Sequence, residues 1–506
     1  MDKTKTTPSP NVVIVGGGTA GWMAAAAFAR FLPAGWTVRL IESDAIGTVG
    51  VGEATIPQLR LFNAHLGIDE DAFVRATLGT FKLGIEFVGW SGPKSSGDSR
   101  YLHAFGTIGR GMGLVPFHHY WLRGGEAAGD LWDYSPTAIA ARGNRFARDL
   151  GRTELPSGVA WAFQFDAALY AAFLRRYAEA RGVERIEGQV VHVAVDDGNI
   201  ASITLEGDRK VAGDLFIDCS GFRGLLIEEA LHAGYEDWTH LLPCDRALAV
   251  PSANAGALTP YTRATAKEAG WQWRIPLQHR CGNGIVYSSA HLSDDRAADI
   301  LLAGLDGAPL ADPRPLRFRA GRRKRAWVGN CIALGLAAGF MEPLESTSIH
   351  LVQSGIARLL QLLPAGDSPA SAAEFNRQTA REWEAIRDFL IFHYHANGRD
   401  EPFWRACREA AIPDSLAARI ALFRESGRIV HESHELFTEV AWLQVMTGQG
   451  IRPQAYHPLA DDLSAAELAE YLALARRHAQ GVAARMPTHD AFIAAHAAAA
   501  PTTVAA

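Results

Sequence analysis

The chain has 506 residues, and its contents of 48% hydrophobic and 21% charged side chains are those of an ordinary globular protein, which excludes a fully disordered chain. Its 49 glycines follow no Gly-X-Y period, which excludes a collagen-like fibre. The 49 basic and 55 acidic side chains give a net charge of −6, and this acidic balance argues against non-specific binding to nucleic acids.

The first predicted unit is a strand, a turn, a helix and a second strand. Residues 12–15 are β-branched, which predicts a strand buried on both faces, as in a parallel sheet. A glycine-rich turn follows, and the alanine-rich residues 22–32 predict a helix that ends near Pro33. Residues 37–41 predict the second strand, which is closed by Glu42.

The glycines of the first turn have the spacing of a dinucleotide-binding motif. Gly16 permits the tight turn, Gly18 permits a pyrophosphate to approach the backbone, and Gly21 permits the helix to pack on the strand. The N-terminus of the helix supplies free N–H groups for the phosphates. Glu42 lies where an acidic residue accepts from a ribose hydroxyl. The alternative is a turn that is merely rich in glycine, but the strand, helix and acid all lie where the motif needs them.

Beyond this unit, local patterns predict a mixture of strands and helices. The apolar residues 81–88 predict a strand, and residues 189–205 predict a hairpin around an Asp-Asp-Gly-Asn turn. Residues 214–219 predict another buried strand, and residues 245–290 predict antiparallel strands. Helices are predicted over residues 56–66, 158–182 and 343–362.

The composition shifts near residue 368, after which apolar stripes predict four helices over residues 371–396, 402–424, 433–447 and 463–485. We therefore divide the chain into a core, residues 1–367, and a mainly helical region, residues 368–506. The helical region is expected to pack on the core as one structural unit.

Two later segments favour FAD over NAD. Residues 213–221 end a strand with Asp-Cys-Ser-Gly, which is similar to the second nucleotide-contacting segment of FAD-dependent monooxygenases. Residues 330–339 are rich in Gly and Ala, which lets the backbone approach a flat isoalloxazine ring. The expected fold is α/β, with a Rossmann-like FAD-binding core of the flavin monooxygenase type, mixed sheets and a mainly helical C-terminal part.

Four further segments resemble the flavin-dependent halogenases, and specifically the tryptophan-halogenase type. Residues 270–276 match the W-x-W-x-I-P pattern, which ordinary flavin monooxygenases lack. Residues 340–346 match most of an F-x-x-P-x-x-S-x-G pattern. Residues 50–57 resemble the loop near the flavin, and residues 80–84 resemble the strand that carries the essential lysine. With the first glycine motif, the resemblance spans residues 11–458.

The resemblance implies that reduced FAD (FADH2), O2 and a halide ion, chloride or bromide, give a hypohalous acid, HOX. The halogen then passes as an electrophile to indole or another electron-rich aromatic molecule. The FADH2 is expected to come from a separate flavin reductase. The core then binds FAD and carries catalysis, and the helical region lies on the substrate side. Further contacts with FAD are implied at Thr19, Ala20, Val190, Leu336 and Ile349.

Two catalytic residues are implied, Lys82 and Glu345. Lys82 lies in an apolar stretch, where loss of solvent lowers a lysine pKa. It either forms a haloamine or hydrogen-bonds HOX, and the sequence leaves both routes open. Glu345 either stabilises the cationic arene intermediate, accepts the ring proton or orients HOX, because electrophilic substitution builds positive charge on the ring. Without the resemblance, Lys82 would be predicted on a solvent-facing strand, and Glu345 as an acid favoured at a helix N-terminus.

The halide is expected to bind the backbone N–H groups of Thr347 and Ser348. Here the sequence departs from the family pattern, because Ser348 stands where the pattern has Gly. A serine keeps the N–H but narrows or re-polarises the halide pocket, and a preference for bromide over chloride is a consequence to test.

The arene is expected to lie between aromatic side chains. His103 and Phe105 resemble family residues that enclose an indole, and Trp442 is predicted to complete the pocket. Trp271 and Trp273 lie two apart on a strand and face the same side. They are either ordinary core aromatics or a wall that keeps a monooxygenase-type substrate away from the flavin. We find no counterpart of the residues that grip the amino-acid end of tryptophan, which favours indole or another small arene.

Two other functions remain open from the sequence. An FAD-dependent aromatic monooxygenase shares the nucleotide motifs, and a flavin-binding protein without catalysis does too. No metal site is predicted, because the histidines of residues 431–435 lack a ligand spacing. The basic run over residues 314–325 is interpreted as a solvated strand face or an attraction for flavin phosphate rather than a nucleic-acid patch.

The five cysteines form no C-x-x-C pair, which argues against a disulfide framework. Reduced thiols, together with polar residues 1–11 and the absence of an apolar run of membrane length, predict a cytoplasmic protein with no membrane partner. A monomer or a homodimer is expected.

Overall fold

The β-branched run near the N-terminus forms an inner strand of a mostly parallel sheet. A computed structural model of the chain describes residues 10–45, 52–92, 99–150, 155–363 and 368–499. β1 (Asn11–Val15) pairs in parallel with β2 (Thr37–Glu42) and with β12 (Leu215–Asp218). The strand order in this sheet is β20 (Trp327–Val328), β21 (Cys331–Ala333), β12, β1, β2 and β8 (Glu184–Glu187). The predicted Rossmann-like core is confirmed.

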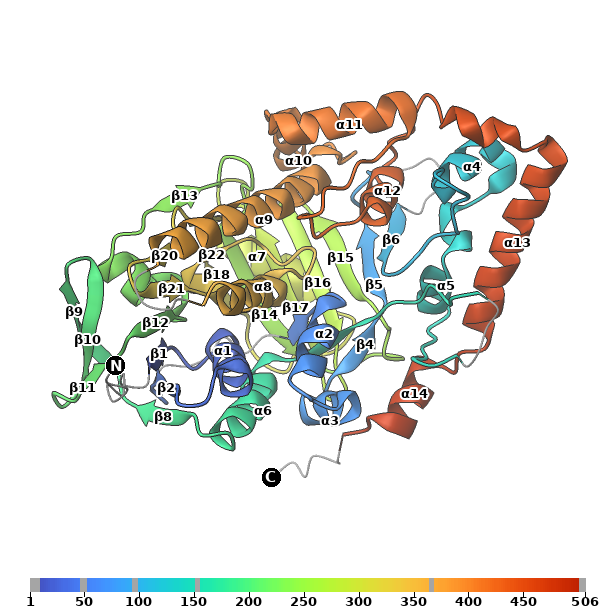
Figure 1. Ribbon diagram of the computed structural model, residues 1–506. Helices are drawn as coiled ribbons and strands as arrows, with labels where there is room; N and C mark the ends of the chain where they lie inside the picture. The colour runs from blue at the N-terminus through green and yellow to red at the C-terminus, as the bar shows by residue number, and fades with distance from the viewer. Residues whose placement is uncertain (1–9, 46–51, 93–98, 151–154, 364–367, 500–506) are drawn as a thin grey trace, which may run out of the picture.

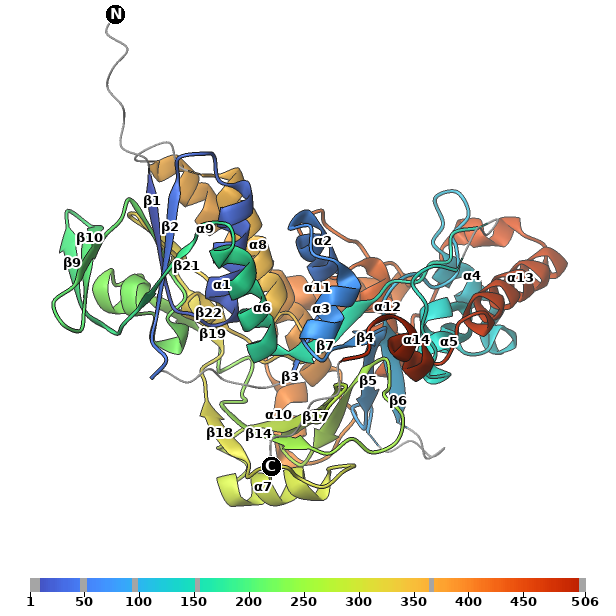
Figure 2. The same cartoon turned by 90° about the horizontal axis from the view of Figure 1, so that it is seen from below.

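Helix α1 (Thr19–Phe31) lies directly after β1 and packs against α6 (Ala167–Glu179) (Figure 2). Its four consecutive alanines, Ala24 to Ala27, are fully buried. Small side chains let the neighbouring helix and strands approach α1 closely, which fixes its N-terminus at the carboxyl ends of β1 and β2. The predicted hairpin is also confirmed; it forms a separate antiparallel sheet of β9 (Val190–Asp196), β10 (Asn199–Leu205) and β11 (Lys210–Ala212).

The largest sheet has seven strands and lies beside the parallel sheet (Figure 1). All its neighbouring pairs are antiparallel except β15 with β5, so the predicted strand near residue 85 meets the predicted antiparallel strands. The strand order is β18 (Arg314–Arg317), β14 (Arg246–Ser252), β17 (Cys281–Tyr287), β16 (Gly270–Pro276), β15 (Thr262–Lys267), β5 (Gly84–Val88) and β6 (Arg100–Ala104). Every residue of β16 and β17 is buried, and α7 (Asp294–Ala303) packs against β14 and β17.

A small antiparallel sheet joins the flavin-loop segment to the lysine strand. Its order is β3 (Gly52–Ala54), β7 (Ala162–Asp166) and β4 (Thr80–Lys82). Residues Gly50 and Val51 of the flavin-loop motif lie outside the described residues. A second small sheet comprises β13 (Tyr235–Asp237), β19 (Gly321–Arg323) and β22 (Gly339–Phe340).

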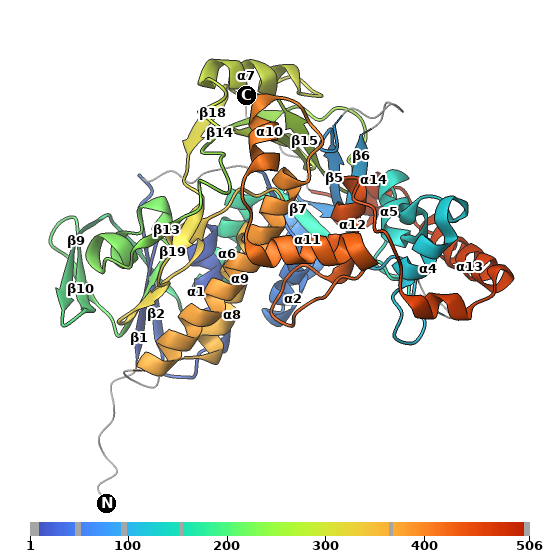
Figure 3. The same ribbon diagram turned by 90° about the horizontal axis from the view of Figure 1, so that it is seen from above.

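The helices of the second half of the chain cover the sheets. They include α8 (Ser348–Gln361), the 27-residue α9 (Pro369–His395), α10 (Pro402–Glu409), α11 (Asp414–Ser426), α12 (Glu439–Gly448), α13 (Ala465–Ala484) and α14 (His489–His496). The α9 helix runs across the molecule and is followed by α10 and α11 (Figure 3).

The remaining helices of the first half are α2 (Gln58–His65), α3 (Glu70–Ala76), α4 (Phe117–Gly124) and α5 (Pro136–Arg142). The helix α12 packs on β6, and α13 packs on α4 and α5 at the edge farthest from the β9–β11 hairpin (Figure 1).

Several predicted helix boundaries are wrong. The segment 158–182 is strand β7 followed by α6, because Phe163 and Phe165 point into the core at strand spacing and Asp166 caps the helix through the N–H groups of residues 168 and 169. The segment 402–424 is two helices, since residue 413 is a proline that interrupts it.

Two predicted helices begin later than expected. Helix α8 begins at Ser348, and α12 begins at Glu439, so residues 343–347 and 433–438 are irregular. In the first case Ser346 adopts a left-handed backbone conformation, φ +59°, which is incompatible with a continuous helix. Both irregular segments carry side chains of the site described below.

The interpretation of the basic run, residues 314–325, as a solvated strand face is only partly right, because two of its arginines are buried. Arg322 and Arg323 on β19 are buried and paired with acids: Arg322 with Glu236 and Glu384, and Arg323 with Glu228. Burial of a guanidinium requires such partners, so this part of the run is structural. Within the described residues, no helix combines the length and apolar character needed to cross a bilayer.

Candidate active site

The first glycine turn brings three parts of the chain together without room for side chains. Gly16 has φ +116°, and a Cβ there would lie 2.2 Å from the carbonyl oxygen of Cys219, the residue after β12. A Cβ on Gly21 would lie 1.9 Å from the carbonyl oxygen of Gly16. A Cβ on Gly18, the residue before α1, would meet no heavy atom within 4 Å, so the surroundings of Gly18 are open. This arrangement suits a phosphate at the helix N-terminus.

Glu42 stands at the carboxyl end of β2, as predicted, but one of its oxygens is already used. Oε1 accepts from Arg185 Nε at 2.6 Å, and Oε2 lies over the Cα of Gly17. The amide N–H of Gly188 donates to the Glu42 carbonyl oxygen at 3.0 Å, which places the chain leading to Val190 beside the same strand end. Oε2 therefore remains as the acceptor that faces the glycine turn.

The other residues predicted to contact FAD gather around the same helix N-terminus. Leu336 lies in the short 3-10 helix after β21, and a Cβ on the preceding Gly335 would be 2.8 Å from the Cβ of Ala20. Thr19 is the first residue of α1, and its hydroxyl donates to the Ala167 carbonyl oxygen at 3.4 Å. Ile349 lies in the first turn of α8, which packs against α1.

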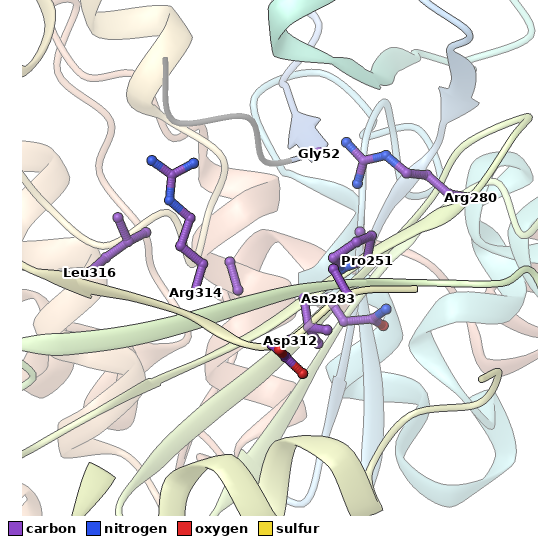
Figure 4. Close-up of a pocket in the computed structure, with 11 residues that line it drawn as sticks. Gly52, Pro251, Arg280, Asn283, Asp312, Arg314 and Leu316 are labelled. Carbon is purple, nitrogen blue, oxygen red and sulfur yellow. The ribbon is translucent and has the colours of Figure 1, made fainter. Parts of the chain in front are cut away.

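A cavity of about 170 Å³ lies between the seven-stranded sheet and the start of β3. Gly52, Asn283 and two arginines line it. Figure 4 shows the guanidinium groups of Arg280 and Arg314 on the same side of the strands as Gly52. Arg280 is paired with Asp166 at 2.7 Å, whereas Arg314 extends from β18 into the space.

Lys82, at the end of β4, is fully buried, which agrees with the role implied by the family resemblance and not with the solvent-facing position expected without it. Its Nζ donates to the Thr55 carbonyl oxygen at 3.0 Å and to Ser346 Oγ at 2.7 Å, and it lies 5.4 Å from the ring centre of Phe105. Burial lowers the pKa of the Lys82 ammonium from 10.5 to about 7, although the charges of Glu345 and Glu53 oppose the shift. Both the amine and the ammonium are therefore accessible near neutral pH.

Glu345 is fully buried and lies between two imidazole rings. His103 Nδ1 is hydrogen-bonded to Oε2 at 2.8 Å, and His393 Nε2 lies 2.8 Å from Oε1, off the line of a regular hydrogen bond. Burial acts to raise the pKa of Glu345, but the two histidines outweigh it and hold this pKa below its usual value. The carboxylate is thus an anion in a water-poor site.

The predicted halide residues follow immediately in the chain. Thr347 is buried, and its N–H and that of Ser348 precede the first intrahelical hydrogen bond of α8, which Leu351 N–H makes to the Thr347 carbonyl oxygen. The four consecutive residues 345–348 therefore make three kinds of contact. Glu345 contacts the two histidines, Ser346 binds Lys82, and the next two residues form the N-terminus of α8. The strained φ of Ser346 is what turns the chain between them.

Aromatic side chains cluster around His103. His103 lies 6.5 Å from Phe105 between ring centres, 5.8 Å from Phe389 and 6.3 Å from Phe437. Trp442 joins this cluster through Phe389, whose ring it meets edge-on at 4.7 Å. Phe389 and Phe437 stack at 3.9 Å.

Sequence reasoning missed His393, Phe389 and Phe437. The two α9 residues belong to an apolar helical stretch in which a histidine or phenylalanine looks like ordinary core. Phe437 lies in a segment expected to be helical. No local pattern distinguishes them, because only the fold brings α9 and the segment before α12 beside His103 and Glu345.

Two further acids with raised pKa values escaped the sequence analysis: Glu342, which is buried, and Glu53, which is half-buried. Burial raises the pKa of Glu53 on β3 to about 7, against the opposing charge of Lys82. Burial likewise raises the pKa of Glu342 to about 7.

The two indoles of the expected wall are neighbours on β16: the rings of Trp271 and Trp273 lie 6.1 Å apart, and a Cβ on Gly284 would overlap the Trp273 ring.

Comparison with known proteins gives consistent results. A family model described as tryptophan halogenase matches residues 11–465. Tryptophan 7-halogenase RebH from Lentzea aerocolonigenes is 36% identical over 488 residues, which cover 88% of this chain and 91% of that protein.

Solved structures agree over a similar extent. Xcc4156, a flavin-dependent halogenase from Xanthomonas campestris, is 49% identical with a TM-score of 0.93, covering 98% of this chain and 99% of that chain. BrvH, a flavin-dependent halogenase from Brevundimonas sp. BAL3, is 47% identical with a TM-score of 0.90, covering 97% of this chain and 99% of that chain.

Proposed function

The chain belongs to the tryptophan halogenase family, and from this premise we propose that it is a flavin-dependent halogenase acting on a small electron-rich arene. The observation that carries the proposal is the fully buried Lys82. Its Nζ donates a hydrogen bond to Ser346, the residue that follows the anionic Glu345 in the chain. A hydroxylating flavin monooxygenase, the alternative considered from the sequence, has no use for a buried lysine beside a carboxylate and is not favoured.

The residues present fit FAD. The glycine turn leaves room at Gly18, the N-terminus of α1 has free N–H groups, and Oε2 of Glu42 faces the turn. When bound, reduced FAD supplies hypohalous acid from O2 and halide. We assign binding of FAD to Gly16, Gly18, Thr19, Ala20, Gly21, Glu42, Val190, Leu336 and Ile349. The guanidinium of Arg314 in the neighbouring cavity favours an anionic cofactor.

Lys82 receives the hypohalous acid. Its Nζ holds the reagent by a hydrogen bond or as a haloamine, and either form keeps the oxidant away from bulk water. Because Thr55 and Ser346 fix Nζ from two sides, the halogen is presented in one direction.

Glu345 acts on the arene. The π electrons of the ring form the C–X bond. With hydrogen-bonded HOX, the X–O bond breaks and its electron pair leaves with oxygen, which becomes water. With the haloamine, water has already left when the N–X bond formed, and the N–X bond breaks with its electron pair returning to Nζ. The ring then loses its proton to a base, and the fixed carboxylate of Glu345 stabilises the positive charge that develops beforehand. The overall exchange is ArH + HOX giving ArX and water.

The substrate is proposed to be indole or an arene of similar size. Support comes from the enclosing rings, His103, Phe105, Phe389, Phe437 and Trp442, which offer stacking surfaces. His103 Nδ1 is committed to Glu345 and is not free to grip an amino-acid group.

The assay that tests this function supplies FADH2, O2, bromide and indole and analyses the products by mass spectrometry. Bromoindole is the expected product. Hydroxyindole without bromoindole would support the monooxygenase, and no product from a range of halides and arenes would support a flavin-binding protein without catalysis.

Replacing Ser348 with glycine is expected to raise the ratio of chlorinated to brominated product several-fold when both halides compete. The serine side chain leaves less room for water around a halide held by the N–H groups of Thr347 and Ser348, and bromide loses its hydration at lower cost than chloride. Product ratios at equal chloride and bromide concentrations measure the effect. Ser348→Ala, which keeps the Cβ and removes the hydroxyl, separates crowding from polarity. An unchanged ratio in both variants would place the halide elsewhere.

The remaining expectations concern the setting of the enzyme. We propose a separate flavin reductase as the source of FADH2, and a monomer or homodimer as the working form. Five unpaired thiols suit a reducing, cytoplasmic environment. We also propose that the helical region and the core form one structural unit, because buried side chains of both belong to one continuous hydrophobic cluster. The proposed boundary at residue 367 lies outside the described residues.

A further inference from the structure

Glu345 is held from two sides, and the reaction outlined above uses only the carboxylate. His103 occupies Oε2, and His393 lies against Oε1, each at 2.8 Å. His393 is in the last turn of α9 and is fully buried. It therefore contacts the carboxylate of Glu345 from α9, and the reaction outlined above gives it no role.

The other ring nitrogen of His393, Nδ1, lies at the end of a chain of hydrogen bonds that runs from Gln449 through Tyr101. Gln449 Nε2, just after α12, donates to the Tyr101 hydroxyl at 3.4 Å and to the His393 carbonyl oxygen at 3.1 Å. The Tyr101 hydroxyl lies 3.3 Å from His393 Nδ1. Burial raises the pKa of Tyr101, so the hydroxyl keeps its proton and has it available for Nδ1. With Nδ1 as acceptor, the neutral ring carries its hydrogen on Nε2, toward Glu345.

Packing holds the ring in this orientation. Phe87 stacks on the imidazole at 4.7 Å, and Trp90 and Phe389 meet it edge-on at 5.9 and 5.2 Å between ring centres. Burial lowers the pKa of His393, and the neighbouring Glu345 only partly opposes this, so the ring is neutral. The ionisable side chains that face it are Glu345, His103 and Tyr101.

Another carboxyl group of this chain indicates what Glu345 would do without such partners. Glu342 is also buried, and burial raises its pKa to about 7. Glu345 is as deeply buried, yet its pKa is shifted in the opposite direction. The difference is the pair of imidazoles at its two oxygens.

We propose that His393, oriented by Tyr101 and Gln449, is the positioning residue that keeps Glu345 ionised and fixes the direction of its carboxylate toward the arene. The inference rests on the proposed halogenase function. It assigns the Gln449–Tyr101–His393 chain to catalysis although none of the three touches the reacting atoms.

The test compares pH profiles of halogenation. In His393→Phe, which preserves a buried ring of similar size, Glu345 loses one partner and its pKa rises toward that of Glu342. A carboxyl group with a pKa near 7 is about tenfold less ionised at pH 6 than at pH 8, so kcat should fall by about that factor on the acid side while remaining close to the parent rate at alkaline pH. His393→Gln, which keeps an N–H donor, should restore much of the acid-side rate.

The controls separate this effect from a loosened structure. His395→Phe, on the same helix turn and remote from Glu345, should leave the pH profile unchanged. If His393→Phe only loosened the structure, the KM for the arene would rise at every pH. If His393→Phe does not fold, as judged by its thermal melting, Tyr101→Phe carries the test with a smaller shift in the same direction.

The outcomes also separate the two proposals. A parent enzyme that makes no halogenated arene would overturn the proposed function before any variant is compared. An active parent whose pH profile is reproduced by His393→Phe, or by Tyr101→Phe where the first does not fold, would overturn the role of His393 alone.

Discussion

Lys82→Ala is expected to abolish halogenation while leaving FAD affinity within a few-fold of the parent value. The variant should lose about a thousandfold in kcat or more, equivalent to about 4 kcal/mol of transition-state stabilisation. The reason is geometric: Nζ is fixed between Thr55, Ser346 and the ring of Phe105, and an alanine leaves a space in which HOX has no directed partner.

Single-turnover product formation and flavin titration measure the two quantities separately. Lys267→Ala is the matched control, because burial also lowers the pKa of Lys267, on β15, yet this residue has no part in the proposed reaction. Loss of activity should be confined to the Lys82 variant. Turnover retained in Lys82→Ala would remove this lysine from the mechanism.

Glu345→Gln is expected to slow halogenation by at least about tenfold, a loss of about 1.4 kcal/mol or more. Glutamine has nearly the same shape, so the contacts with His103 and His393 are spatially preserved, while the negative charge opposite the developing arene cation is lost. The effect should appear in kcat rather than in the KM for the arene.

The matching control uses a buried acid away from the histidine pair. Glu382→Gln alters a carboxylate that binds Arg358 and His350 between α8 and α9, and it is expected to affect thermal stability more than rate. Arene halogenation by Glu345→Gln at the parent rate would leave Glu345 as a structural connection between α8, α9 and β6.

The nucleotide half of the site was largely predictable because its determinants are local. A β-branched run, three spaced glycines and an acid at the next strand end specify their own geometry, and the structure places Gly16, Gly18, Gly21 and Glu42 accordingly. The pairing of Glu42 with Arg185 was not predictable, since Arg185 lies on a strand far along the chain.

The catalytic half was predictable only through the family resemblance and only in part. The apolar neighbours of Lys82 allowed a buried position, but only the resemblance favoured it, and its partners Thr55 and Ser346 come from distant segments. The contact of His393 with Glu345 depends on where a 27-residue helix crosses a sheet, and the left-handed turn at Ser346 opposes the helical tendency of its neighbours. Tertiary packing therefore determines both the contact of His393 with Glu345 and the turn at Ser346, and a local sequence pattern predicts neither.

The peptide that joins Glu345 to Ser346 has a consequence for engineering. The carboxylate that serves the guest and the hydroxyl that steadies the amine belong to neighbouring residues, so a shift of this turn moves both groups together. A change in which ring carbon is halogenated therefore requires the arene to rotate between the aromatic side chains around it. Substitutions at Phe389, Phe437 and Trp442 are the ones expected to alter regiochemistry.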